Sequence, residues 1–173
     1  MKCTRSTIRH QSGFTMIEVL AATVILAFAV IAVAEAVSVA QSQTYEALHD
    51  GRATSLAEAF LEEVVSKPYA DPAGGEVNLG PDLDELSRNL FDNIDDYHGF
   101  TLDTLNADDP DVITDIAGNV LPQMYQIFSI NISTQYTTVT LFESVPGISV
   151  TVTVTDKTGR AWTASRFVPE SGG

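Results

Sequence analysis

Hydrophobic residues are distributed unevenly along the chain, and their spacing changes twice. A continuous apolar run covers residues 19–34 and is interrupted only by Thr23. About 20 apolar residues span a bilayer core of about 30 Å, so this run predicts a membrane-spanning helix over about residues 14–40. Further on, apolar residues recur three, four or eight positions apart, as on one face of an amphipathic helix: Leu48, Leu56, Ala59, Phe60 and Val64.

The two apolar patterns are predicted to form one helix. No proline occurs between Phe14 and Lys67, and Pro68 then gives a stop signal. The sequence therefore predicts a single helix over residues 14–66, on the order of 80 Å long at 1.5 Å rise per residue. Its first half would lie in the membrane, and its second half would pack against a folded domain.

The C-terminal third changes to a period of two, which is typical of strands. Residues 148–155 alternate Ile or Val with Ser or Thr, and residues 124–133 are rich in β-branched and aromatic side chains. The segment Asp-Lys-Thr-Gly at residues 156–159 predicts a hairpin turn whose second strand covers residues 160–168. We therefore expect an α+β fold, with a small antiparallel sheet packed on the amphipathic half of the helix.

A turn-rich segment separates the helix from these strands. Residues 68–120 contain most of the prolines and many glycine and aspartate residues. One short helix is expected over residues 82–90, because Asp82 can cap it and Glu85 follows three positions later.

Charge narrows the possible functions. The chain has 173 residues and a net charge of −14. Its leader, residues 1–13, carries three cations (Lys2, Arg5 and Arg9) and no acid, so removing it would leave a mature chain near −17. Nucleic-acid surfaces need clustered Lys and Arg, so we exclude that class of partner. The basic leader predicts a cytoplasmic N-terminus and a C-terminal part outside the cytoplasm.

Candidate chemistry is sparse. The single cysteine, Cys3, lies in the leader, so the mature chain can form no disulfide. The histidines, His10, His49 and His98, fall in the leader, the helix and a loop. The sequence has no zinc-binding spacing, no G-x-S-x-G motif and no phosphate-binding glycine loop, so we expect no enzymatic activity.

One carboxylate, Glu18, stands at the entrance of the apolar run. A charge inside a membrane costs roughly 2.5–3.5 kcal/mol, so such a residue normally has a function. The junction formed by residues 13–18, Gly-Phe-Thr-Met-Ile-Glu, resembles the class III signal of type IV pilins and type II secretion pseudopilins. The resemblance implies that prepilin peptidase cuts after Gly13 and N-methylates Phe14, and that Glu18 guides assembly.

The same resemblance implies a pilin-like fold and a structural role in a type IV pilus-like or type II secretion filament. Its partners would be prepilin peptidase, other pilin or pseudopilin subunits and the inner-membrane assembly platform. The chain would cross the inner membrane once and present residues 67–173 outside as a globular head. The segment Asp95-Asp96-Tyr97 is similar to a loop of D-type minor pilins of the mannose-sensitive haemagglutinin pilus, which favours a minor pilin. The chain departs from the family in lacking a C-terminal disulfide and a proline late in the apolar run.

A second processing signal stays open. Ala34-Glu35-Ala36 resembles the A-x-A site of an ordinary signal peptide, and cleavage there would release an acidic domain that begins at Val37. The alternative function is therefore a membrane-anchored or released periplasmic binding domain that does not polymerise.

The turn-rich segment also holds a group of aspartates. Oxygen ligands of this kind suit Ca²⁺, but no EF-hand pattern occurs and the same residues are common in solvated turns. No cofactor is therefore expected, with Ca²⁺ as the alternative and without assigned ligands. The aromatic residues Phe91, Tyr97 and Phe100 are expected to fix the loop to the core, and Trp162 to pack in the core or at its edge. The aspartates are Asp92, Asp95, Asp96, Asp108, Asp109 and Asp111.

Overall fold

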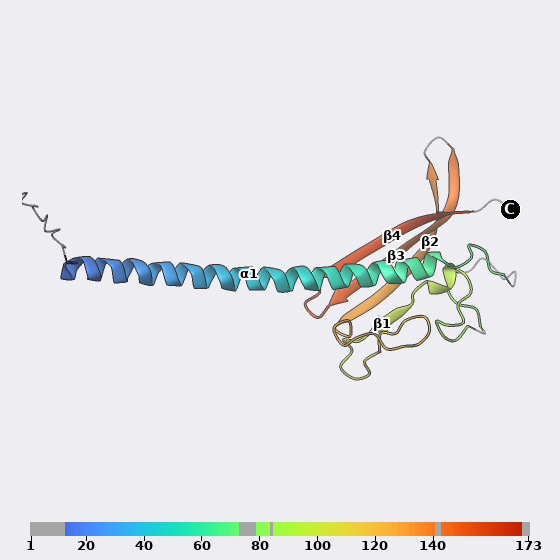
Figure 1. Cartoon of the computed structure of the whole chain (residues 1–173). Coiled ribbons are helices and arrows are strands. Elements are labelled where there is room, and N and C mark those ends of the chain that lie inside the picture. Colours follow the sequence, from blue (N-terminus) through green and yellow to red (C-terminus); the bar gives the residue numbers. More distant parts are fainter. Residues whose placement is uncertain (1–12, 73–78, 84, 141–142, 171–173) are drawn as a thin grey trace, which may run out of the picture. The chain divides into compact units, whose positions relative to one another are not determined.

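The computed structural model describes residues 13–72, 79–83, 85–140 and 143–170. The predicted leader therefore lies, apart from Gly13, outside the described residues. A long helix is followed by a four-stranded antiparallel sheet, which confirms the predicted α+β, pilin-like arrangement (Figure 1). The elements are α1 (Met16–Val65), the 3-10 helix η1 (Asp95–Tyr97), β1 (Thr101–Asp103), β2 (Phe128–Thr140), β3 (Ser144–Asp156) and β4 (Ala161–Pro169).

Helix α1 contributes to two compact units, residues 1–46 and residues 47–173. In the first unit, α1 is long and apolar enough to cross a membrane, and its apolar side chains are exposed. The observed bounds of α1 differ from the predicted helix by only two residues at the start and one at the end. The absence of an internal proline explains why one continuous helix forms.

The sheet of the second unit has the strand order β1-β2-β3-β4. Strands β2 and β3 form a long hairpin, in which Phe128 pairs with Asp156 at one end and Thr140 pairs with Ser144 at the other. The predicted turn between β3 and β4 is also present, with Gly159 at a φ of +84°. A left-handed conformation of this kind favours glycine, which is why the sequence signal was reliable.

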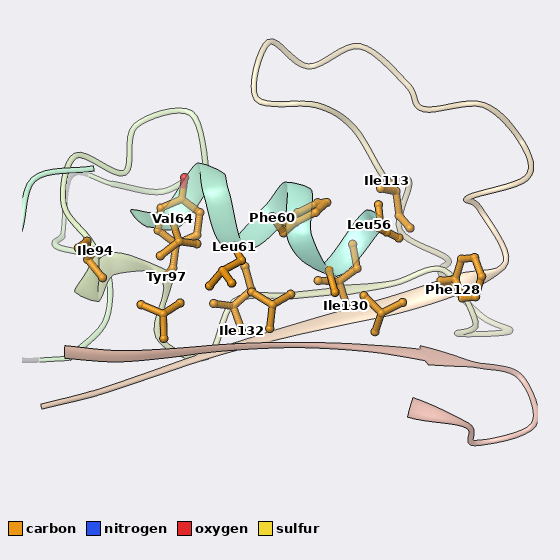
Figure 2. Packing of buried hydrophobic residues seen from close by; sticks show 14 of the residues in the cluster. Leu56, Phe60, Leu61, Val64, Ile94, Tyr97, Ile113, Phe128, Ile130 and Ile132 are labelled. Atoms are coloured by element: carbon orange, nitrogen blue, oxygen red, sulfur yellow. The ribbon is translucent and has the colours of Figure 1, made fainter. Parts of the chain in front are cut away.

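The core of the second unit lies between α1 and one face of the sheet (Figure 2). The prediction was correct for Leu56, Phe60 and Val64, which are buried, but wrong for two residues. Ala59 is exposed, and Leu48 is 50% exposed. The buried stripe repeats at three and four residues and includes neither of them, because it consists of Ala53, Leu56, Ala57, Phe60, Leu61 and Val64.

The short helix predicted over residues 82–90 does not form in the described part of this segment. Its capping contacts are nevertheless present, because Glu85 N–H donates to the Asp82 carbonyl at 3.0 Å and Asp82 N–H donates to Glu85 Oε2 at 3.2 Å. The other Glu85 oxygen accepts a hydrogen bond from Asp92 N–H at 3.1 Å. Arg88 donates a hydrogen bond to Glu63 of α1. These tertiary contacts override the local helical preference.

Candidate functional site

The predicted cleavage junction lies immediately before α1. Residues 13–15 are not helical, and the Phe14 side chain is 81% exposed. A Cβ atom built on Gly13 would meet no atom within 4 Å. The structure therefore places the Gly13–Phe14 peptide bond in an accessible, non-helical segment.

Glu18 lies in the first turn of α1, and its carboxylate reaches back to the backbone of Thr15. The carbonyl of Thr15 accepts hydrogen bonds from the N–H groups of Glu18 and Val19, at 3.0 and 3.2 Å. Glu18 Oε2 accepts a longer bond from Thr15 N–H, at 3.4 Å. The spacing Thr-x-x-Glu favours this contact from the glutamate to the backbone. The helix dipole also favours a carboxylate at this end.

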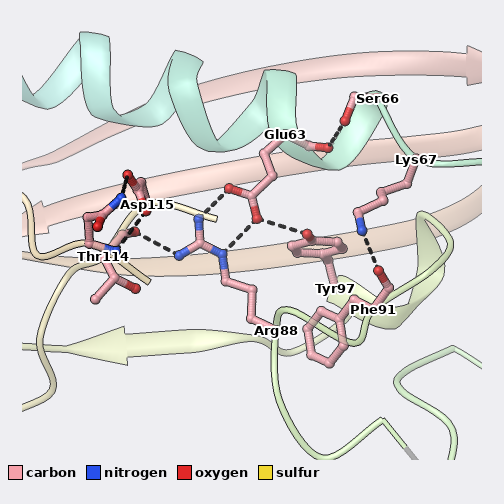
Figure 3. A network of polar contacts seen from close by, with 9 residues as sticks. Glu63, Ser66, Lys67, Arg88, Phe91, Tyr97, Thr114 and Asp115 are labelled. Carbon is pink, nitrogen blue, oxygen red and sulfur yellow. Dashed lines mark hydrogen bonds and ion pairs between the residues drawn. The ribbon is translucent and has the colours of Figure 1, made fainter. Parts of the chain in front are cut away.

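A polar network in the second unit ties the turn-rich segment to α1 (Figure 3). Arg88 donates from Nε to Glu63 Oε1 at 2.7 Å and from a terminal nitrogen to Glu63 Oε2. Its other terminal nitrogen donates to the Thr114 carbonyl at 2.9 Å, and its guanidinium lies 4.3 Å from the centre of the Phe60 ring. The hydroxyl of Tyr97 donates to Glu63 Oε1 at 2.8 Å. Glu63 of α1 thus binds Arg88 and Tyr97, which lie 25 and 34 positions after it in the sequence.

The Asp95-Asp96-Tyr97 segment forms η1 and is buried. The prediction that its aromatic residues fix the loop is confirmed, since the Tyr97 ring lies edge-on to Phe91 and Phe100 at centroid distances of 5.0 and 6.2 Å. Burial and the hydrogen bond to Glu63 raise the pKa of Tyr97 well above its ordinary value, so the phenol stays protonated and donates. The resemblance to a minor-pilin loop thus falls on a segment with a structural role.

Asp95 makes a second buried contact from the same turn. Its carboxylate interacts with the Tyr136 phenol of β2, which lowers the pKa of Asp95 against the effect of burial. Burial, together with the nearby Asp95 carboxylate, raises the pKa of Tyr136 to about 12. Burial also raises the pKa of Asp95 itself.

Three carboxylates of the turn-rich segment could hold a metal ion. Oxygens of Glu85, Asp92 and Asp96 lie within 4.8 Å of one another, the only such group in the described parts of the chain. Asp96 Oδ2 already accepts hydrogen bonds from the N–H groups of Asp92 and Asn93, each at 2.9 Å. Burial raises the pKa of Glu85 and of Asp92. Hydrogen bonds to the loop backbone therefore account for this arrangement, which does not include Asp95, Asp108, Asp109 or Asp111.

A clamp that the sequence analysis did not predict joins α1 to the β3–β4 turn. His49 Nε2 lies 3.0 Å from Asp156 Oδ2, and the His49 ring packs against Phe128 and Trp162 at 4.9 and 5.4 Å between centroids. The Asp156 side chain is only 7% exposed. The hydroxyl of Thr158 donates to Asp156 and not to His49, so this group does not have the arrangement of an activated nucleophile.

Asp156→Asn is expected to lower the melting temperature of the detergent-solubilised chain by several degrees at pH 7. Hydrogen bonds from Thr158 and His49 hold the pKa of Asp156 well below its usual range. A depressed carboxyl pKa stabilises the fold above the unfolded-state value of about 3.9, and this stabilisation declines as the pH falls below that value. The difference between wild type and variant should therefore begin to shrink near pH 4 and keep shrinking as the pH falls further, as followed by circular dichroism.

The matched control is Asp50→Asn, since Asp50 forms an exposed ion pair with Arg160 beside the clamp. Exposed pairs contribute little to stability, so this variant should change the melting temperature much less. A wild-type advantage over Asp156→Asn that stays constant down to pH 3 would contradict the role assigned to Asp156.

Comparison with known proteins points to the N-terminal junction. Residues 8–34 match the family model of the prokaryotic N-terminal methylation motif, and this range contains Gly13, Phe14 and Glu18. No curated protein and no solved structure shows significant similarity to the chain. The exposed apolar part of α1 fits anchoring in the inner membrane. The methylation motif thus supports a type IV pilin-like protein that is processed by prepilin peptidase.

Proposed function

We propose that this chain is a minor pilin or pseudopilin, cut after Gly13, methylated at Phe14 and incorporated into a type IV pilus-like or type II secretion filament. The observation that supports this most directly is the junction itself. An accessible Gly13–Phe14 bond precedes a capped apolar helix, and Glu18 lies in its first turn within the matched methylation motif.

In this proposal, subunits assemble by packing the exposed apolar surfaces of their first units against one another. The helix of this unit is rich in Ala and Val, and large apolar side chains such as Ile25, Leu26 and Phe28 are at least 63% exposed. Small residues let helices in lipid approach closely, so this surface suits packing against other subunits. The partners are prepilin peptidase, other pilin or pseudopilin subunits and the assembly platform of the inner membrane. The head faces away from the cytoplasm, and this structural role requires no cofactor.

Glu18 has a specific task in this proposal. Cleavage creates an α-amino group on Phe14, four residues before Glu18. A carboxylate near the membrane needs a partner charge, and such an amine, on the same or a neighbouring subunit, provides one. Pairing between subunits would set the register of helix packing. The resemblance of residues 95–97 to a minor-pilin loop supports the minor-subunit assignment.

Glu18→Ala is expected to leave cleavage at Gly13 largely intact while reducing incorporation into filaments by at least about tenfold. An unpaired amine in a helix bundle costs several kcal/mol, which exceeds the roughly 1.4 kcal/mol needed for a tenfold change. The measurement compares processed protein in the membrane with protein in sheared filaments by quantitative immunoblotting.

Glu35→Ala provides the matched control. Glu35 is also an exposed carboxylate on the apolar half of α1, but it lies far from Phe14 in the sequence. This variant should assemble at close to the wild-type level. Normal assembly of Glu18→Ala would refute the assembly role, and equal loss in both variants would show that the effect is not specific to the position of Glu18.

A further inference from the structure

The β2–β3 hairpin extends beyond the rest of the sheet and forms an arm. We define the arm as residues 136–140 of β2 together with residues 144–146 of β3. On one side, β1 pairs only with residues 129–131 of β2. On the other side, the pairing of β4 ends at Gly147 of β3, followed by one bond from Glu170 N–H to the Pro146 carbonyl at 2.9 Å. Figure 1 shows this two-stranded ribbon projecting past β4. A two-stranded ribbon is marginally stable by itself, so an arm of this kind gains from a third strand.

The open edge of the arm can be identified from the hydrogen-bond direction along β2. Ile132 N–H donates to the Phe100 carbonyl at 2.9 Å, and the Ile132 carbonyl accepts from Gly99 N–H at 3.0 Å. Even-numbered residues of β2 therefore direct their backbone groups away from β3. At Thr138 and Thr140 these groups meet no other strand among the described residues.

The arm lies in a segment of the sequence that has almost no charged residues. Between residues 126 and 155 the only charged residue is Glu143, although the chain has a net charge of −14. Two copies of so acidic a protein repel each other over most of their surfaces. The arm is a surface through which another copy can approach without that repulsion.

A matching strand edge is present on β4, the outermost strand on the other side of the sheet. Ile132 and Val152 form a pair that does not exchange hydrogen bonds, so Val152 bonds to Ala164 and the odd-numbered residues of β4 face outward. Thr163 and Ser165 are exposed there and, with part of α1, line a groove of about 530 Å³.

The charges around this edge complement those of the arm. Arg166 contributes to the lining of the groove, and Arg160 lies just before β4. The chain has few other Lys and Arg residues. Glu143 is the single acidic residue next to the arm. Both arginines are about half exposed, although each also contacts an acid of α1.

We propose that the arm of one copy adds as an extra strand to the β4 edge of a second copy. Strand addition supplies backbone hydrogen bonds without requiring complementary charges, as in other β-augmentation contacts. The two surfaces differ, so the contact is head-to-tail and can continue from copy to copy. This inference extends the proposed filament role by naming a contact between heads.

Cysteine cross-linking tests this contact directly. Cys3→Ser removes the only cysteine, whether or not the leader is cut. In this background, a chain with Thr138→Cys and one tag is co-expressed with a chain carrying Thr163→Cys and another tag. Membranes are treated with a bismaleimide, which tolerates small shifts in register. The expected main product joins the two tags and exceeds by about tenfold the product of a Ser133→Cys control, which lies on β2 before the arm.

The other cross-linking outcomes contradict the proposal. A dominant product between two Thr163→Cys chains would indicate symmetric pairing of β4 with β4. A dominant product between two Thr138→Cys chains would indicate pairing of two arms. A product no stronger than the Ser133→Cys control would show that the arm does not reach β4.

Proline variants add a second readout. Thr138→Pro removes an outward N–H donor and leaves the β2–β3 bonds in place, so we expect the cross-link from a Thr140→Cys probe to Thr163→Cys to fall roughly fivefold to tenfold. Thr138→Ala keeps the donor and should have no effect. Ser165→Pro tests the recipient edge in the same way if Thr138→Pro fails to fold by circular dichroism. Unchanged cross-linking with a folded proline variant overturns the proposal.

The cross-link and the filament role can fail separately. If Phe14 is methylated and filaments form, but no cross-link appears, only the contact between heads is wrong. If the cross-link appears while Gly13 stays uncut, the contact stands and the proposed processing is wrong.

Discussion

Glu63→Ala is expected to lower the free energy of unfolding of the head by about 3–5 kcal/mol, the usual cost of removing one partner of a buried ion pair. The side chains of Arg88 and Glu63 are only 10% and 14% exposed. The variant leaves the guanidinium without its carboxylate and the Tyr97 hydroxyl without its acceptor. Thermal unfolding of the detergent-solubilised chain should show a melting temperature lower by about 10–15 °C.

The neighbouring residue offers a matched control. Glu62 forms an ion pair with Arg166, but both side chains are about half exposed or more. Exposed pairs contribute about 0–1 kcal/mol, so Glu62→Ala should shift the melting temperature by only a few degrees. Equal losses in the two variants would contradict the role assigned to the Glu63 network.

A double substitution separates the ion pair from simple packing. Glu63→Leu with Arg88→Met removes both charges and keeps much of the apolar volume. Replacing both partners of a buried pair is often close to neutral, so the double variant should be more stable than Glu63→Ala. A double variant as unstable as the single one would show that the loss does not come from an uncompensated charge.

Gly13→Arg is expected to leave essentially all of the chain as uncut precursor. A Cβ atom built on Gly13 would meet no atom within 4 Å, and Gly13 precedes α1, so the substitution should not disturb the helix. Any loss of processing must then come from recognition by the peptidase. Mass spectrometry of the membrane-bound protein should detect N-methyl-Phe14 in the wild type and an intact leader in the variant.

Ala36→Leu is the matched control, and it also tests the rival processing site. Ala36 is the residue before the cut in the alternative signal, where a small side chain is required. If prepilin peptidase processes the chain, Ala36→Leu should yield the same N-methyl-Phe14 product as the wild type. A wild-type N-terminus at Val37 that disappears in Ala36→Leu would establish the released periplasmic domain instead.

The elements that were predicted correctly are those whose signals lie close together in the sequence. The long helix followed from an uninterrupted, proline-free pattern, and the β3–β4 hairpin followed from strict alternation around Gly159. The signal at residues 13–18 also consists of neighbouring residues, and it lies within residues 8–34, which match the methylation motif.

The contacts that were missed bring distant residues together. His49 and Asp156 are separated by 107 positions, and Arg88 lies 25 positions after Glu63. No periodicity connects such pairs, because they meet only in the folded structure of the second unit. The incorrect helix at residues 82–90 has the same origin, since its local capping signal was real and the contact from Arg88 to α1 prevailed.

The cap at Thr15 has a kinetic consequence for processing. A protease binds its substrate in an extended form, so cutting within a helix first requires the free energy of local opening. The helical hydrogen bonds begin at the Thr15 carbonyl, and the Gly13–Phe14 bond lies just outside them. The proposed cut therefore requires no unwinding of α1, and we expect its rate not to depend on the stability of the helix that would pack in the filament.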